Sequence, residues 1–140
     1  MTTEQVSVSA DGASRGNPGR AAIGAVIRDQ HGKVVCRISR AIGIATNNQA
    51  EYQALIAALR EAISLGARRV DIKVDSELVV RQALGGYRVK NAGLKPLHRE
   101  LVTLLASLER FSLAHMPGED NHEAHHLAGL ALRPSRSGED

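Results

Sequence analysis

The sequence predicts one α/β domain with a five-stranded mixed sheet and helices on both of its faces. Three observations point to this fold class. The 140 residues provide enough chain for one hydrophobic core. The first part of the chain contains three strand-like segments with short links, which is typical of an antiparallel meander. The remainder alternates strand-like with helix-like segments, and this order packs helices against a sheet that includes parallel strands.

The three strands of the meander are predicted at residues 5–11, 21–29 and 33–42. In the first of them valines alternate with serines, which is the period of a strand with one buried face. Residues 12–19 are rich in Gly, Asn and Pro, and this composition predicts a turn. A second turn at residues 29–32 contains Gly and joins the next two strands. Links this short favour antiparallel neighbours.

The rest of the chain changes to a helical period. Apolar residues recur at helical spacing after Asn47 and Asn48, which can cap the helix, and Gly66 can end it. The further elements are helices at 48–65, 76–84, 95–108 and 121–132, and strands at 70–75 and 111–116. The order is therefore β-β-β-α-β-α-α-β-α. It assigns residues 1–132 to the domain and leaves residues 133–140 as a tail that we expect to be mobile.

Composition excludes several classes of protein. Aromatic residues make up 2%, which argues against modules that stack many unpaired bases on rings. Cys36 is the one cysteine, so an internal disulfide and a zinc site of several thiolates are both excluded. The chain has no apolar run of about 18 residues and does not begin with a secretory pattern. We therefore expect a cytoplasmic monomer that does not associate with a membrane and has no obligate protein partner.

Three acidic residues are predicted to lie near one edge of the sheet. Asp11 and Asp75 each end a strand, and Glu51 lies in the first turn of the long helix. Each also has an ordinary explanation, as a turn residue, a helix cap or a partner of the helix dipole. If they converge, the three carboxylates cannot all stay ionised without cations, and such oxygen ligands suit Mg²⁺ or Mn²⁺. Two ions of this kind can activate a water for phosphodiester cleavage.

Five short segments carry a more specific pattern. They are Asp11–Gly19 (DGASRGNPG), Thr46–Tyr52 (TNNQAEY), Val74–Ser76 (VDS), Val89–Asn91 (VKN) and Asn121–Ala128 (NHEAHHLA). In their order and spacing they resemble the type 1 ribonuclease H family over nearly the whole chain. The resemblance implies the ribonuclease H-like fold, whose element order is the one predicted above. The chain resembles a short form of the family, because it lacks the basic protrusion that some members insert before Val89.

The resemblance also implies an activity. Members of this family are endoribonucleases that cut the RNA strand of RNA/DNA hybrids and leave 3′-hydroxyl and 5′-phosphate ends. By position, the catalytic and metal-binding carboxylates would be those of Asp11, Glu51 and Asp75. The positions that match contacts to the minor groove and the RNA 2′-hydroxyls are Gly12, Ala13, Asn17 and Asn48. The positions that match contacts to a DNA phosphate are Thr46 and Asn91.

One departure from the family concerns the fourth carboxylate, whose place is taken by His125. The surrounding Asn121, Ala124 and Leu127 keep the family pattern, so the alignment of this segment holds. A histidine can bind a divalent ion or a metal-bound water, but it carries no negative charge when neutral. We expect His125 to be the fourth catalytic and metal-binding residue of an active enzyme. We also expect weaker binding of a second Mg²⁺ and a shift toward Mn²⁺, which accepts nitrogen ligands more readily.

Two other functions remain open from the residues alone. A hybrid-binding module could retain the fold with catalysis weakened by His125. A zinc hydrolase could use His122–His126, which fits the H-E-x-x-H pattern, although the rest of the chain has no part in that explanation. A third observation favours nucleic acid: residues 81–100 carry five cations against Glu100, a local charge of +4 in a chain of net charge +3. Such a segment can contact the DNA strand, or can simply be a solvated helix face.

Overall fold

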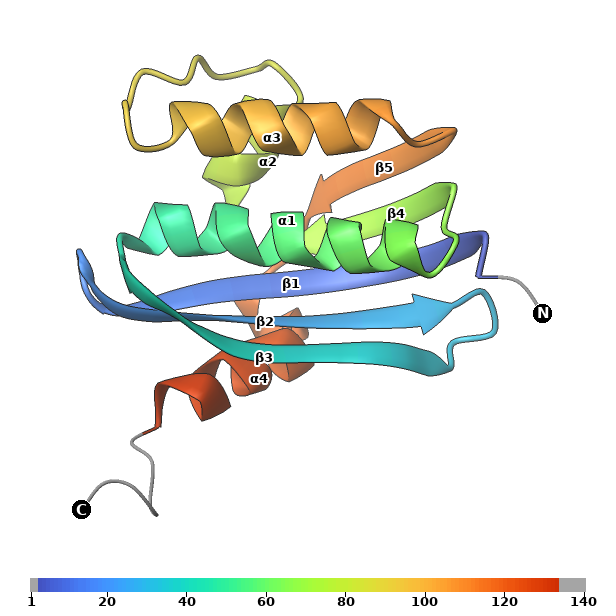
Figure 1. Cartoon of the computed structure of the whole chain (residues 1–140), viewed down its shortest axis with the longest axis horizontal. Helices are drawn as coiled ribbons and strands as arrows, with labels where there is room; N and C mark the ends of the chain where they lie inside the picture. The colour runs from blue at the N-terminus through green and yellow to red at the C-terminus, as the bar shows by residue number, and fades with distance from the viewer. Residues whose placement is uncertain (1–2, 134–140) are drawn as a thin grey trace.

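The computed structural model describes residues 3–133 and confirms the predicted fold class (Figure 1). Five strands form one mixed sheet in the order β3-β2-β1-β4-β5. The strands are β1 (Gln5–Gly16), β2 (Gly19–Asp29), β3 (Val34–Ala45), β4 (Arg69–Val74) and β5 (Arg110–His115). The helices are α1 (Asn47–Ser64), α2 (Glu77–Ala83), α3 (Lys95–Ala106) and α4 (His122–Leu132), with a short 3₁₀ helix η1 (Gly118–Asp120) before the last. Most of the predicted tail, residues 134–140, lies outside the described residues.

The first hairpin is longer than predicted. Strand β1 pairs with β2 in antiparallel fashion as far as Gly16, which lies opposite Gly19, so the turn is confined to Asn17 and Pro18. The prediction of a turn over residues 12–19 is therefore wrong. Glycine weakens a strand only slightly, and the ladder formed with β2 outweighs that local preference. The hairpin consequently extends well beyond Asp11.

Helices cover both faces of the sheet, as predicted. Figure 1 shows α1 and α3 on one side and α4 on the other. Two glycines in the central strands allow these close approaches. A Cβ atom on Gly12 would lie 2.2 Å from the carbonyl carbon of Ala50 in α1, and one on Gly24 would lie 2.1 Å from the carbonyl oxygen of Ala124 in α4. Because a side chain fits at neither place, both helices are seated directly on the strand backbones.

The long helix begins at a reciprocal cap. The hydroxyl of Thr46 accepts a hydrogen bond from the backbone N–H of Gln49 at 3.1 Å, and the Gln49 side chain accepts one from the N–H of Thr46 at 2.8 Å. This arrangement is a capping box. The cap is thus Thr46, and the prediction that Asn47 or Asn48 caps the helix is wrong. This cap fixes the start of α1, and Glu51 follows directly after the first turn of the helix.

Among residues 3–133, no helix combines the length and the apolar character that crossing a bilayer requires.

Candidate active site

The register of the two central parallel strands brings two aspartates side by side. Strands β1 and β4 pair from Gln5 opposite Arg69 to Ala10 opposite Val74, and the next residue on each strand is Asp11 or Asp75. Strand β4 stops there, while β1 continues along β2. The prediction that Asp11 ends its strand is therefore wrong. Asp11 does, however, follow the last residue of β1 that pairs with β4. The two side chains meet where the sheet opens.

Glu51 reaches the same place from α1. The close contact between Gly12 and the backbone of Ala50 and Glu51 brings the glutamate over the strand, next to Asp11. The backbone N–H of Gly12 donates a hydrogen bond of 2.9 Å to Oε1 of Glu51. This bond fixes the orientation of the carboxylate. The glycine thus has two effects, since it makes room for the helix and holds its functional side chain.

The structure brings the three carboxylates together. Asp11, Glu51 and Asp75 each offer an oxygen, and these oxygens all lie within 4.8 Å of one another. Asp11 is buried, and the other two are partly exposed. The cluster thus joins residues that are far apart in the sequence, since Asp11 and Asp75 are separated by 64 positions. The ordinary explanations of each acid taken singly do not account for this convergence.

The cluster is electrostatically unfavourable without a cation. Burial, with a smaller contribution from the charge of Asp75, raises the pKa of Asp11 to about 6, and a hydrogen bond from His125 opposes that rise. Burial and the charge of Asp11 raise the pKa of Glu51 to about 9, although the N–H of Gly12 favours its ionised form. Crowded carboxylates are stabilised as anions by a divalent ion, and oxygen donors are what Mg²⁺ and Mn²⁺ prefer. The residues present therefore fit such an ion.

His125 lies against one member of the cluster. Its Nδ1 is 2.9 Å from Oδ2 of Asp11, while the histidine side chain is 74% exposed. The cluster of mutually close ligand atoms contains the three carboxylates and does not include this histidine. The structure thus places His125 as a hydrogen-bond partner of Asp11, with its Nε2 left for other contacts.

Asn121 joins the start of α4 to β1. It is 2% exposed, and its Nδ2 donates a hydrogen bond of 3.0 Å to the carbonyl oxygen of Ala10, the residue before Asp11. The backbone N–H of His125 donates to the carbonyl oxygen of Asn121 at 3.1 Å. The sequence suggested a helix cap at Asn121, yet its side chain does not cap the helix. Asn121 is thus bonded both to Ala10, the neighbour of Asp11, and to the backbone of His125, and it helps to keep α4 next to β1 at the His125–Asp11 contact.

The expected contacts to the minor groove surround the first hairpin. Oδ1 of Asn17 accepts a hydrogen bond from the backbone N–H of Asn47 at 3.0 Å, which ties the hairpin turn to the start of α1. Asn48 is exposed beside it, and Ala13 is half-buried in β1. The N–H of Gly12 is already bonded to a carboxylate, so this group is not available to a ligand.

The two expected phosphate contacts also lie close together. Oδ1 of Asn91 accepts from the N–H groups of Gly93 at 2.7 Å and Leu94 at 3.2 Å, which leaves the amide nitrogen as a donor. A Cβ atom on Gly93 would lie 2.8 Å from Nε2 of Gln49. This loop therefore packs on Gln49, the partner of Thr46 in the capping box. The sequence analysis missed Gln49, although its position three residues after a threonine is the signal of a capping box.

The zinc-hydrolase alternative finds no support in the geometry. His122 and His126 are exposed on α4, and Glu123 forms an ion pair with Arg28 of β2. Within the part of the chain that the structure describes, no group of three candidate metal ligands includes these residues.

Comparisons with known proteins agree with the motifs and the fold. A family model described as reverse transcriptase-like matches residues 9–131. The crystal structure of RNase H1 from the halophilic archaeon Halobacterium salinarum has a TM-score of 0.89 and is 41% identical, covering 91% of this chain and 97% of that one. The chain belongs to the ribonuclease H family. The resemblance inferred from the motifs is thereby confirmed.

Other members of the ribonuclease H family are similar over most of this chain. LC11-RNase H1, isolated from compost, has been solved in complex with an RNA/DNA hybrid; its TM-score is 0.85 at 37% identity, covering 91% of this chain and 96% of that one. The ribonuclease HI of H. salinarum is 42% identical over 87% of this chain, and the bifunctional protein Rv2228c of Mycobacterium tuberculosis is 41% identical over 91%. The chain spans 61% and 35% of the lengths of these two relatives.

Proposed function

We propose that this member of the ribonuclease H family is a metal-dependent endoribonuclease. It hydrolyses the RNA strand of RNA/DNA hybrids and leaves 3′-hydroxyl and 5′-phosphate ends. The observation that carries the proposal is the convergence of Asp11, Glu51 and Asp75 at the opening between β1 and β4. The similar LC11-RNase H1, solved with an RNA/DNA hybrid, supports the choice of substrate.

The three carboxylates would hold Mg²⁺ or Mn²⁺, most simply as a pair of ions. Such ions, when bound, activate a water and stabilise the leaving oxygen of a phosphodiester. The protein's own part is to fix the oxygens. Gly12 orients the Glu51 carboxylate, and His125 orients that of Asp11. If a nitrogen of His125 also contacted such an ion, it would favour Mn²⁺ over Mg²⁺.

The hairpin and the start of α1 would read the substrate from its minor groove. We assign Gly12 and Ala13, through the backbone, and the side chains of Asn17 and Asn48 to this contact. The carbonyl of Gly12 is the group we assign there, because its N–H is bonded to Glu51. Hydrogen bonds to 2′-hydroxyls distinguish RNA from DNA at a given position. Selection of the RNA strand would follow from these contacts.

The DNA strand would be held by a phosphate contact and by charge. We assign the Thr46 hydroxyl and the amide of Asn91 to one DNA phosphate, since the Thr46 hydroxyl is bonded to the backbone N–H of Gln49 and the loop of Asn91 packs, at Gly93, on the side chain of Gln49. Such a contact positions the duplex without reading its sequence. The cations of residues 81–100, from the end of α2 to the first turns of α3, would extend the contact along the strand. They are Arg81, Arg88, Lys90, Lys95 and Arg99.

A second candidate function is a hybrid-binding module with weakened catalysis. The observation that favours it is His125, which supplies no negative charge where the family has a fourth carboxylate. Both functions share the substrate and differ in turnover. They are therefore separated by a cleavage assay and not by a binding assay.

The experiment that tests the proposal is a substrate panel. An RNA/DNA hybrid, double-stranded RNA, single-stranded RNA and double-stranded DNA, each labelled, are incubated with the protein and Mg²⁺ or Mn²⁺. We expect cuts in the RNA strand of the hybrid, with products that polynucleotide kinase labels only after removal of the 5′-phosphate. Tight binding of the hybrid without any cut would favour the binding module. Equal cleavage of single-stranded RNA would contradict the proposal.

A further inference from the structure

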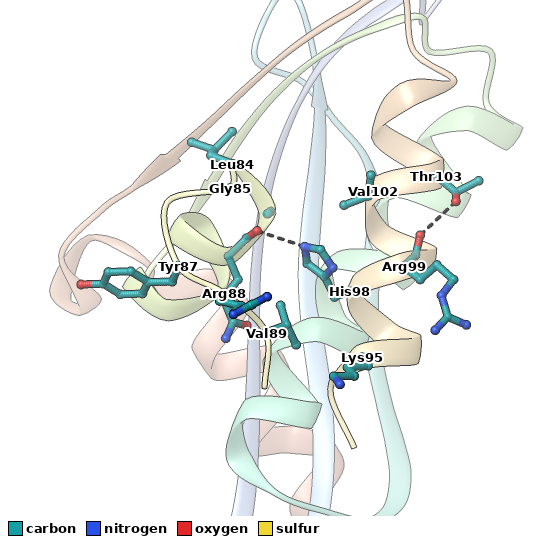
Figure 2. A pocket seen from close by; sticks show the side chains of 12 residues that line it. Leu84, Gly85, Tyr87, Arg88, Val89, Lys95, His98, Arg99, Val102 and Thr103 are labelled. Carbon is teal, nitrogen blue, oxygen red and sulfur yellow. Dashed lines mark hydrogen bonds between the residues drawn. The ribbon is translucent and has the colours of Figure 1, made fainter. Parts of the chain in front are cut away.

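A hollow of about 680 Å³ lies between the loop that follows α2 and the outer side of α3 (Figure 2). None of its lining residues belongs to the carboxylate cluster. Its volume is that of sites that take small organic groups. Leu84 on one side and Val102 on the other remain 56% and 39% exposed, and Val89 also lines the hollow. The hollow is thus an open apolar surface that residues 3–133 do not cover.

Three cations line the same hollow. Arg88 comes from the loop, and Lys95 and Arg99 come from the first turns of α3. None of the three forms an ion pair with another residue of the described range 3–133. An apolar surface beside unpaired positive charge is complementary to a group that is both apolar and anionic. A nucleobase with its phosphates has this character.

The hollow also contains a hydrogen-bond acceptor with a fixed orientation. Nε2 of His98 lies 3.0 Å from the backbone carbonyl of Gln82, drawn as a dashed line in Figure 2. A carbonyl can only accept, so Nε2 carries the proton, and in the neutral imidazole Nδ1 is left as an acceptor. The Gln82 side chain accepts a hydrogen bond of 2.6 Å from the buried Tyr52 hydroxyl, which holds this part of α2 in place. An N–H group of a base could donate to Nδ1 of His98.

The position of the hollow indicates which nucleic-acid strand would reach it. The loop that lines it, residues 84–94, also contains Asn91, which we assign to a DNA phosphate. A DNA strand held at Asn91 would lie near the hollow, because Val89 of the same loop lines it.

We propose, on the basis of the function proposed above, that the hollow receives one unpaired nucleotide of the DNA strand beside the hybrid. The base would lie against Val89 and Val102, and its phosphates beside Arg88, Lys95 and Arg99. One base in a hollow lined by aliphatic side chains and the single ring of Tyr87 needs no row of aromatic rings, in agreement with an aromatic content of 2%. The enzyme would therefore prefer hybrids whose DNA strand extends beyond the RNA.

The test compares hybrids that differ only in their ends. The dissociation constant is measured by fluorescence anisotropy with Mg²⁺ and the Asp75→Asn protein, so that the substrate stays intact. The ligands are a blunt hybrid, the same hybrid with a 5′ or a 3′ DNA extension, and the same hybrid with an RNA extension. We expect one of the DNA extensions to tighten binding about tenfold over the blunt hybrid.

Two variants of the hollow and two matched controls identify the place of contact. Val102→Asp and Arg99→Ala, each added to Asp75→Asn, should bring the ratio between extended and blunt hybrids close to one. Leu130→Asp is the control for the first, because Leu130 is 38% exposed on α4, and Arg37→Ala on β3 is the control for the second. Both controls should keep the ratio of the parent. All four substitutions are at exposed or partly exposed side chains, so the fold should tolerate them.

The outcomes separate this inference from the proposed function. Equal binding of blunt and DNA-extended hybrids, or an equal gain from the RNA extension, would overturn the inference and leave hybrid cleavage untouched. An extension effect that survives both Val102→Asp and Arg99→Ala would also overturn it. Absence of any hybrid binding would overturn the proposed function together with it.

Discussion

Nδ1 of His125 lies 2.9 Å from Oδ2 of Asp11, across the boundary between α4 and β1. The imidazole is mostly exposed, while the aspartate is buried. The contact therefore joins a ligand atom of the carboxylate cluster to a side chain that solvent or substrate can reach. We expect the histidine, at the position where the motif of the family has a carboxylate, to act on the cluster through this hydrogen bond.

Replacing His125 tests this role. His125→Ala should lower kcat/KM by about tenfold or more, because a hydrogen bond to a charged group contributes about 1.5–3 kcal/mol. His125→Asp should change kcat/KM with Mg²⁺ by less than about tenfold, since the fourth position assists a cluster that is already assembled. The ratio of Mn²⁺ to Mg²⁺ activity should fall in His125→Asp. A much larger gain in that variant would mean that the native site is crippled by its histidine.

Removing one charge of the cluster should separate activity from stability. Asp75→Asn should lower kcat by about 10²–10³ or more, since a group that stabilises the transition state is lost. In a chelator the same variant should melt at a higher temperature than the parent, by a few degrees for about 1 kcal/mol of relieved repulsion. Thermal melts in EDTA and single-turnover rates in Mg²⁺ measure the two effects. A variant that is both inactive and less stable would indicate a structural role for Asp75.

The stability of the metal-free protein should depend on pH in an unusual direction. The pKa values of Asp11 and Glu51 in the folded protein are about 6 and about 9, above the ordinary 3.8 and 4.5. The folded protein thus keeps protons that the unfolded chain releases, so this stabilisation is complete below pH of about 4 and is lost as the pH rises through about 6 and about 9. Melting temperatures in EDTA should fall over that range.

Two controls belong to this pH series. Mg²⁺ binds the ionised carboxylates, so its addition should raise the melting temperature most at the alkaline end. Glu51→Gln should flatten the part of the curve above about pH 7 in EDTA. A parent protein whose melting temperature in EDTA rises from pH 5 to pH 9 would contradict the electrostatic account of the cluster.

The seat of α4 on the sheet can be tested with a pair of glycines. Gly24→Ala should destabilise the protein by about 1–3 kcal/mol, because its Cβ would collide with the backbone of Ala124. Gly129→Ala, on the same helix with nothing near its Cβ, should stabilise it by about 0.5–1 kcal/mol. Chemical denaturation measures both. If Gly24→Ala keeps its stability and its activity, close packing of α4 is not what positions His125.

The cap of α1 should matter for stability and for binding. Thr46→Val removes the hydroxyl that accepts from Gln49 and should cost about 1 kcal/mol of stability. The same change removes the proposed donor to a DNA phosphate, so KM for the hybrid should rise, while its salt dependence should stay that of the parent because the hydroxyl carries no charge. Thr46→Ser keeps the hydroxyl and should restore both properties. A Thr46→Val protein with an unchanged KM would remove this residue from the substrate contact.

Most of the fold could be predicted because period and turn composition are local properties. The alternation in β1 and the helical period of α1 gave the element order, and the motifs gave the acids. What the sequence hid was set by pairing over a distance. Pairing with β2 keeps β1 extended through a glycine-rich segment whose composition is typical of a turn. The Asn121 amide donates its hydrogen bond to the carbonyl of Ala10 and does not cap its own helix.

The site shows the same division. Asp11, Glu51 and Asp75 could be named from the motifs, but their mutual distance depends on strand register and on the missing side chain of Gly12. The hydrogen bond of His125 to Asp11 could not be read from spacing, because it depends on how closely α4 approaches β1. The sequence shows the excess of positive charge in residues 81–100, but it does not indicate the hollow beside α3 that some of these residues line.

The most direct test of the central claim is metal-dependent cleavage of a hybrid labelled on its RNA strand. The parent protein is freed of metal with EDTA and then given Mg²⁺ or Mn²⁺, beside the Asp75→Asn variant under the same conditions. The account predicts cuts in the RNA strand that appear only after the metal is restored and are absent with the variant. Cleavage that continues in EDTA, or that Asp75→Asn performs at the parent's rate, would contradict it.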